Sequence, residues 1–196
     1  MIVYGPDCET TGLSPVDHEL IAVQFADAEG SITRFARWEH DGEAAMLAAF
    51  LEAWTAIDRK RAGGGAMFVG VNHLGFDVPF LLARGIALAD DLEHWSEGRL
   101  WDELYRWPVY LDLAQLVGND LVGMTDLRRE LLETAAERPS RDVPVLYRNE
   151  RFDALDERLD DQLAALRAVH LALRGTDLYR EVVRFRRRLD AARDLT

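Results

Sequence analysis

The order of β-prone and helix-prone segments is the feature that most constrains the fold of this chain. Three β-prone segments come first, and a short turn at residues 28–30 joins the second and third into an expected hairpin. A helical stripe of apolar residues follows, and two further strands then alternate with a helix. This order predicts an α/β domain with a mixed five-stranded sheet flanked by helices. The expected strands cover 1–4, 19–27, 31–37, 67–71 and 109–113, and the expected helices among them cover 41–59 and 77–84.

The second half of the chain has a helical pattern. Helices are expected over 125–137, 151–174 and 177–193, with a proline-containing loop over 138–145. Leucines at 155, 159, 163 and 166 mark the face of the long helix that should pack on the sheet. We therefore expect residues 1–174 to form one domain, and residues 175–196 to form a C-terminal helix packed on it or extending from it.

Composition excludes several classes of protein. The 35 acidic and 23 basic residues give a net charge of -12, which argues against holding nucleic acid mainly by bulk positive charge. The same charge is compatible with an enzyme whose bound cations supply a positive field. No apolar run is long enough to cross a membrane, and the N-terminus lacks the pattern of a secretory signal. A lone cysteine, Cys8, excludes an internal disulfide, so we expect a cytoplasmic protein with Cys8 as a small core residue.

The end of the first strand carries two acidic residues, in the run Asp7-Cys8-Glu9. Side chains alternate faces along a strand, so Asp7 and Glu9 should point to the same side and Cys8 to the other. Two neighbouring carboxylates repel unless a cation lies between them, and oxygen ligands suit Mg²⁺ or Mn²⁺. The alternative is that these acids only cap the strand-to-loop junction. Pro6 cannot donate a ladder hydrogen bond, so we expect a bulge there or a strand that starts later.

A second acidic motif, Asn72-x-x-x-Phe76-Asp77, joins a strand to a helix start. Asp77 by itself could be a helix-capping residue. The two motifs together resemble the DEDD superfamily of 3′–5′ exonucleases, the DnaQ-like branch of the ribonuclease H-like fold. The resemblance is closest to the branch related to the proofreading domain of family B polymerases, and it covers about residues 1–174.

The resemblance implies a fold, a metal site and a substrate groove. It implies a ribonuclease H-like sheet and two ions, Mg²⁺ or Mn²⁺, held by four carboxylates. Three of these would be Asp7, Glu9 and Asp77. The fourth would come from the late helix, where Asp160 is the first choice and Asp161 the second. The residues that would contact the terminal nucleotide are Thr10, Thr11, Gly12, Asn72 and Phe76.

The third motif of the family departs from the expected pattern in this chain. The family places a tyrosine four residues, or a histidine five residues, before the last aspartate. Asp156 lies four residues before Asp160, and Glu157 lies four before Asp161. Asp156 is therefore the expected replacement for the missing catalytic side chain, with Glu157 as the alternative. These acids could instead form a solvated helix face.

The expected function is a two-metal 3′–5′ exonuclease. It would bind the 3′ end of a nucleic acid and release nucleoside 5′-monophosphates, with single-stranded DNA preferred over RNA as the substrate. The first alternative is a catalytically silent domain that keeps the fold and acts as a nucleic-acid-binding or adaptor module. The second is an endonuclease of the same fold.

Overall fold

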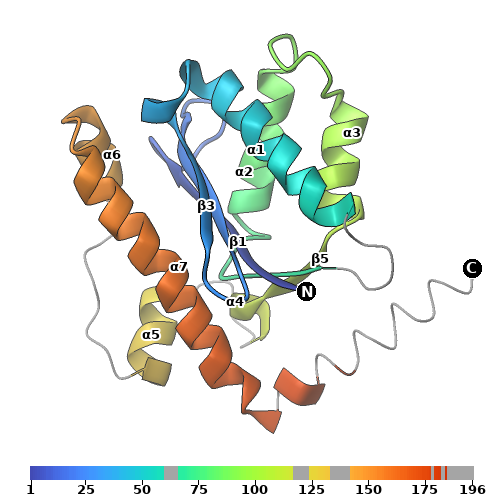
Figure 1. Ribbon diagram of the computed structural model, residues 1–196, viewed down its shortest axis with the longest axis vertical. Helices are drawn as coiled ribbons and strands as arrows, with labels where there is room; N and C mark the ends of the chain where they lie inside the picture. The colour runs from blue at the N-terminus through green and yellow to red at the C-terminus, as the bar shows by residue number, and fades with distance from the viewer. Residues whose placement is uncertain (60–65, 117–123, 133–141, 178, 182–183, 185–196) are drawn as a thin grey trace, which may run out of the picture.

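The structure is a computed structural model that describes residues 1–59, 66–116, 124–132, 142–177, 179–181 and 184 (Figure 1). Its five strands form one sheet with the order β3-β2-β1-β4-β5. Strand β2 runs antiparallel to both β1 and β3, whereas β1, β4 and β5 are parallel to one another. This confirms the predicted α/β class with a mixed sheet. The strands are β1 (Ile2–Thr10), β2 (Leu20–Asp27), β3 (Ile32–Ala36), β4 (Met67–Gly70) and β5 (Val109–Asp112).

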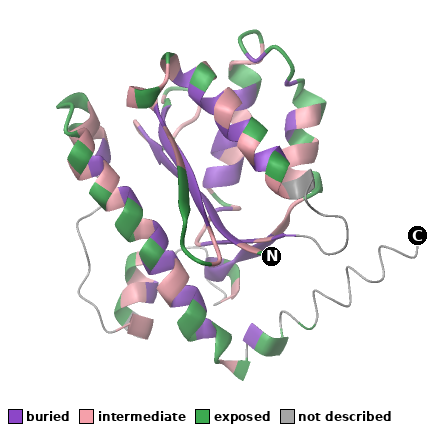
Figure 2. Ribbon diagram, in the orientation of Figure 1, coloured by how far each residue is buried: buried purple, intermediate pink, exposed green. Residues whose placement is uncertain are grey.

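Helices cover both faces of the sheet (Figure 1). On one face, α1 (Gly42–Arg59), α2 (Asp77–Ala87) and α3 (Glu97–Trp101) enclose the larger apolar core with side chains from β1, β2 and β4. On the other face, α5 (Met124–Leu132) and α7 (Phe152–Arg174) enclose a second core. The sheet and the inner faces of these helices are the buried part of the molecule (Figure 2). The remaining helices are η1 (Arg37–Glu39), η2 (Asp102–Arg106), α4 (Leu113–Leu116) and α6 (Val143–Arg148).

Strand β1 contains the expected bulge. The pairing register with β2 shifts between Tyr4 and Asp7, so Pro6 lies where no ladder hydrogen bond is needed. Beyond the bulge, Cys8 packs into the core beneath α1 and α2, as predicted. Asp7 and Glu9 therefore point to the face covered by α7.

The structure differs from the sequence-based expectations in several segments. Strand β1 extends to Thr10, whereas the expected first strand ended at residue 4, and the short helices η1 and α4 were not predicted. Residues 143–145 were expected in a loop, but α6 begins at Val143 because Pro144 is tolerated in the first turn of a helix. Helix α3 and the π-helical turn η2 were not predicted, since both are too short to show a periodic pattern. Most of the expected helix over 177–193, and residues 133–137 of another, lie outside the described residues. In the described part of the chain, no helix combines the length and apolar character needed to span a bilayer.

Candidate active site

Three acidic side chains from two distant segments meet at one edge of the sheet. Asp7 and Glu9 lie near the carboxyl end of β1, and Asp77 is the first residue of α2. The backbone N–H of Cys8 donates to Asp77 Oδ1 at 2.8 Å, which fixes the start of α2 against β1. The structure thus brings together the three carboxylates that the two sequence motifs predicted to be neighbours.

Burial raises the pKa of all three carboxyl groups, and repulsion by the Asp7 charge adds to the rise for Glu9 and Asp77. Burial, followed by the charge of Asp7, raises the pKa of Glu9 to about 8. The same two causes raise the pKa of Asp77 well above its ordinary range. Burial also raises the pKa of Asp7, although a hydrogen bond from Gln24 opposes the rise. The three negative charges are therefore unfavourable together, and a cation among them would stabilise the charged state.

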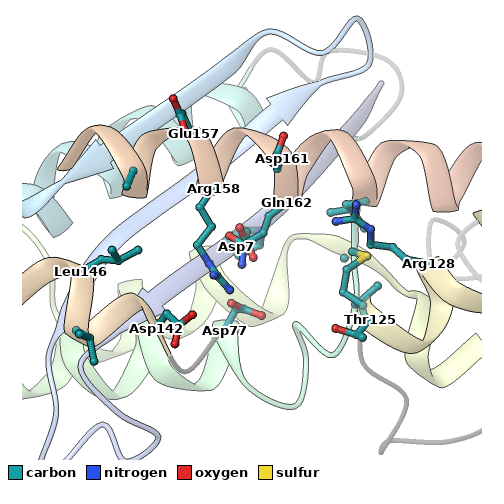
Figure 3. Close-up of a pocket in the computed structure, with 17 residues that line it drawn as sticks. Asp7, Asp77, Thr125, Arg128, Asp142, Leu146, Glu157, Arg158, Asp161 and Gln162 are labelled. Carbon is teal, nitrogen blue, oxygen red and sulfur yellow. The ribbon is translucent and has the colours of Figure 1, made fainter. Parts of the chain in front are cut away.

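Helix α7 presents two side chains to these carboxylates, Arg158 and Gln162. Gln162 Nε2 donates to Glu9 Oε1 at 2.7 Å. The Arg158 side chain extends from α7 toward Asp7 and Asp77 (Figure 3), and its positive charge opposes the rise in the pKa of Asp7 and Glu9. Sequence reasoning missed both residues. Their spacing of four, which places them on adjacent turns of one helix face, was the available signal.

Asp156 and Asp160 project from the opposite flank of α7. Arg34 of β3 donates to Asp156 Oδ1 at 2.6 Å and also bonds the Asp160 carboxylate. The same arginine donates to Gln24 Oε1 at 3.2 Å, and Gln24 Nε2 donates to Asp7 Oδ2 at 2.9 Å. The structure therefore joins Asp156 and Asp160 to Arg34, rather than to the three carboxylates at the end of β1.

Asp161 and Glu157 occupy a third side of the helix. Both are exposed and line the rim of the cavity beside the carboxylates, and their side chains extend to the other side of α7 from Arg158 and Gln162 (Figure 3). The helical period accounts for this placement, because the buried leucines face the sheet and residues 157 and 161 lie on the opposite side of the helix. Among the described residues, no aspartate of α7 thus joins Asp7, Glu9 and Asp77 to form a set of four carboxylates.

A cavity of about 680 Å³ opens beside Asp7 and Asp77. Its walls come from β1, β4, α5, α6 and α7, so it collects residues from both halves of the chain. Arg128 of α5 and Asp142 at the start of α6 add charge to the lining (Figure 3). In the described part of the chain, neither a tyrosine nor a histidine lines this cavity.

Thr10 is the last residue of β1, and the other predicted substrate-binding residues lie in the loops after β1 and β4. These two strands are parallel, so both loops leave the same edge of the sheet. Thr10 Oγ1 donates to the Gly12 carbonyl at 2.6 Å, and Thr11 Oγ1 accepts from Glu19 N–H at 2.9 Å. A Cβ on Gly12 would lie 2.3 Å from the His18 ring, which accounts for glycine there.

The second loop is held by a strand-end carboxylate. The backbone N–H of Asn72, which has a φ of 59°, donates to Asp112 Oδ1 at 2.8 Å. Phe76 is partly buried and packs on Phe80, with ring centroids 5.5 Å apart. None of the five predicted substrate-binding residues belongs to the described lining of the cavity.

The donor set at the end of β1 fits a hard divalent cation. Asp7, Glu9 and Asp77 supply only carboxylate oxygens, the ligands that Mg²⁺ and Mn²⁺ prefer. Each carboxylate accepts a hydrogen bond from the protein: Asp7 from Gln24, Glu9 from Gln162, and Asp77 from the backbone N–H of Cys8. Among the residues that the structure describes, no three acidic, histidine or cysteine side chains are already arranged around one metal position. These hydrogen bonds would therefore rearrange when an ion binds.

Comparison with solved structures establishes the type of fold. No protein-family model and no curated protein sequence matches this chain. A family B DNA polymerase from the hyperthermophilic archaeon Pyrobaculum calidifontis matches 88% of the chain, with a TM-score of 0.64 and 15% sequence identity. A structure described as the apo form of a nuclease covers 89% of the chain and 84% of its own length at 18% identity. Its TM-score of 0.36 is too low to show a shared fold.

The polymerase comparison supports the ribonuclease H-like fold predicted from the motifs. The chain corresponds to 24% of the polymerase, so it resembles one part of that much larger protein. A structural similarity at 15% sequence identity shows a similar fold and nothing about activity. The activity of this chain must be argued from its own site.

Proposed function

We propose that this protein is a metal-dependent nuclease of the DEDD type, which removes nucleotides from the 3′ end of a single-stranded nucleic acid. The observation that carries the proposal is the meeting of Asp7, Glu9 and Asp77 at one sheet edge, beside an open cavity. A ribonuclease H-like fold and the two matched sequence motifs support the same function. DNA is the favoured substrate, with RNA as the alternative.

The proposed reaction is hydrolysis of the terminal phosphodiester bond. A water oxygen bonds to phosphorus, the bond from phosphorus to the 3′ oxygen breaks, and the leaving oxygen takes up a proton. The products are a nucleoside 5′-monophosphate and a strand with a new 3′ hydroxyl. Mg²⁺ or Mn²⁺ held by the three carboxylates would supply Lewis-acid stabilisation of the charge that develops on the phosphate oxygens.

The remaining residues of the site would bind and orient the strand. Thr10, Thr11 and Gly12 form a tight turn at the sheet edge, where backbone N–H groups can approach the terminal nucleotide. Asn72 and Phe76 belong to the neighbouring loop, and the Phe76 ring would stack with a base. Arg128 of α5 lines the cavity and would attract the phosphate backbone.

Incubation of the full chain with a 5′-labelled single strand and Mn²⁺ tests this function. The proposal requires a ladder of shortened products that is lost in Asp7→Ala. A circular single strand should stay intact, because an exonuclease needs an end; its cleavage would indicate an endonuclease instead. An intact linear strand under all metal conditions would overturn the proposal.

A second function is favoured by the side chains of α7. Arg158 and Gln162 supply a cation and a neutral amide where a fourth carboxylate is expected, and no histidine or tyrosine of the described residues lines the cavity. A catalytically silent domain that binds nucleic acid would retain such a site. It would bind a single strand without cleaving it, and its thermal stability would not depend on Mn²⁺.

A further inference from the structure

On the side of α7 that faces the three carboxylates, the side chains differ in charge from those of the family pattern. Arg158 and Gln162 are four residues apart, the same spacing that the family pattern gives to its tyrosine and last aspartate. Gln162 reaches Glu9 through its amide nitrogen at 2.7 Å. Its Oε1 atom is buried and accepts no hydrogen bond in the structure. Gln162 therefore supplies a neutral amide where the family pattern would supply a fourth carboxylate.

The formal charges at the site no longer match two divalent ions. Four ionised carboxylates carry four negative charges, which two divalent cations neutralise. When a bound cation keeps them ionised, Asp7, Glu9 and Asp77 would carry three negative charges, and Arg158 carries one positive charge, since a guanidinium stays protonated at any relevant pH. The remaining two negative charges are neutralised by a single divalent ion.

We infer that Arg158 is a permanent cation of this site, so that the site takes one divalent ion and binds a phosphate group of the nucleic acid through the Arg158 guanidinium. The guanidinium extends into the cavity lining toward Asp7 and Asp77 (Figure 3). Its planar fork of N–H groups suits two phosphate oxygens at once. The inference rests on the proposed function, because it concerns the same three carboxylates.

Counting bound Mn²⁺ tests the number of ions without using activity. Equilibrium dialysis of the full chain, with free Mn²⁺ measured by electron paramagnetic resonance, should give one ion per wild-type chain. The double variant Arg158→Met/Gln162→Asp should bind two ions, because it loses the fixed cation and gains a fourth carboxylate. Arg174→Met is the matched control, since Arg174 is exposed on the same helix about four turns away and should leave one ion bound.

Each result has a distinct meaning. Two ions on the wild-type chain would overturn the inference and leave the proposed nuclease function standing. A single ion on the double variant, with an unchanged circular dichroism spectrum, would also overturn the inference. Absence of Mn²⁺ binding together with an uncleaved strand would overturn the proposed function itself.

Nucleotide binding tests the role of Arg158 toward phosphate. Calorimetric titration with thymidine 5′-monophosphate in Mn²⁺ should show affinity reduced about 10- to 100-fold in Arg158→Met, as expected for loss of a charged hydrogen bond. Arg158→Lys should restore part of the affinity, because it keeps the charge but not the fork. Equal affinity in Arg158→Met and the wild type would show that this arginine does not bind the phosphate.

Discussion

At the scale of single residues, Arg34 determines which acids of α7 are available to the site. Its guanidinium, largely buried beside β3, bonds both Asp156 and Asp160 and reaches Gln24 as well. Moving a carboxylate away from a buried arginine costs free energy, because the arginine then loses its ion-pair partner. Asp160 is thus a structural partner of Arg34 in this arrangement.

Asp160→Asn therefore tests the predicted late-helix ligand directly. We expect this variant to keep Mn²⁺ binding and strand cleavage within about threefold of wild type. The free energy of unfolding should fall by only about 0–1 kcal/mol, because the Asp160 side chain is exposed. Asp7→Asn should lower cleavage by more than about 100-fold, the upper end of the range for outer-shell metal partners. Dialysis and the labelled-strand assay measure both effects. Equal losses in the two variants would restore Asp160 as a ligand.

Glu9 gives a pH dependence whose sign follows from its raised pKa. The pKa of Glu9 is about 8 in the folded protein and 4.5 unperturbed, so the folded state holds this proton more tightly than the unfolded chain. Its stabilising contribution is complete below pH 4.5 and is lost as the pH rises through 8. Without metal, Glu9→Gln should therefore melt above wild type at pH 8, by about 2–6 °C, and the difference should shrink toward pH 5.

Thermal melts in EDTA across this pH range measure the effect. Glu52→Gln, an exposed change on α1, is the control and should shift the melting temperature little at any pH. A Glu9→Gln protein that melts below wild type at pH 8 would contradict the unfavourable charge at this site.

At the scale of elements, a buried ion pair holds the helices on the core face together. Arg84 of α2 bonds both oxygens of the Glu43 carboxylate on α1, at 2.8 and 2.7 Å, and its third contact is the Pro15 carbonyl. Glu43 also accepts from the Leu20 N–H at the start of β2. Because α2 begins at Asp77, this pair also stabilises the helix that positions a candidate ligand.

Arg84→Met should destabilise the protein by about 3–5 kcal/mol, since it leaves Glu43 buried and unpaired. The double variant Glu43→Gln/Arg84→Met should recover part of this loss, because the buried charge is then removed. Arg180→Met breaks an exposed pair with Asp177 and serves as the control, with an expected cost of about 0–1 kcal/mol. Urea unfolding measures all three, and a loss below 1 kcal/mol for Arg84→Met would contradict a structural role for the pair.

At the scale of the whole molecule, the proposed metal binding would be linked to fold stability through the three carboxylates. The chain carries a net charge of -12, and the candidate site concentrates part of that charge in a buried place. A ligand that binds only the folded state stabilises it, by about 2.7 kcal/mol when its concentration is one hundred times the dissociation constant.

Mn²⁺ at neutral pH should accordingly raise the melting temperature by about 5–10 °C, and EDTA should reverse the rise. Asp77→Asn should abolish the metal-dependent part of the shift, whereas Asp153→Asn, an exposed change in the first turn of α7, should retain it. Differential scanning fluorimetry at several Mn²⁺ concentrations measures the shift. A melting temperature independent of Mn²⁺ would favour the silent nucleic-acid-binding module.

Local patterns in the sequence determined much of this protein. Strand alternation alone separates Cys8, in the core, from Asp7 and Glu9 on the other face. Hydrophobic periodicity located the five strands and α1, α2 and α7 to within a few residues at most boundaries, because these elements are long or strongly patterned. The proximity of Asp77 to β1 was predicted through the paired motifs.

Only the tertiary structure decided which side chains of α7 meet the carboxylates. The leucine stripe identifies the face of α7 that packs on the sheet. It does not indicate which of the two flanks of that face lies toward the end of β1. The direction in which α7 crosses the sheet turns one flank, with Asp156 and Asp160, toward Arg34, and turns the other, with Arg158 and Gln162, toward the end of β1. Crossing direction depends on packing between residues more than one hundred positions apart, and no local pattern encodes it.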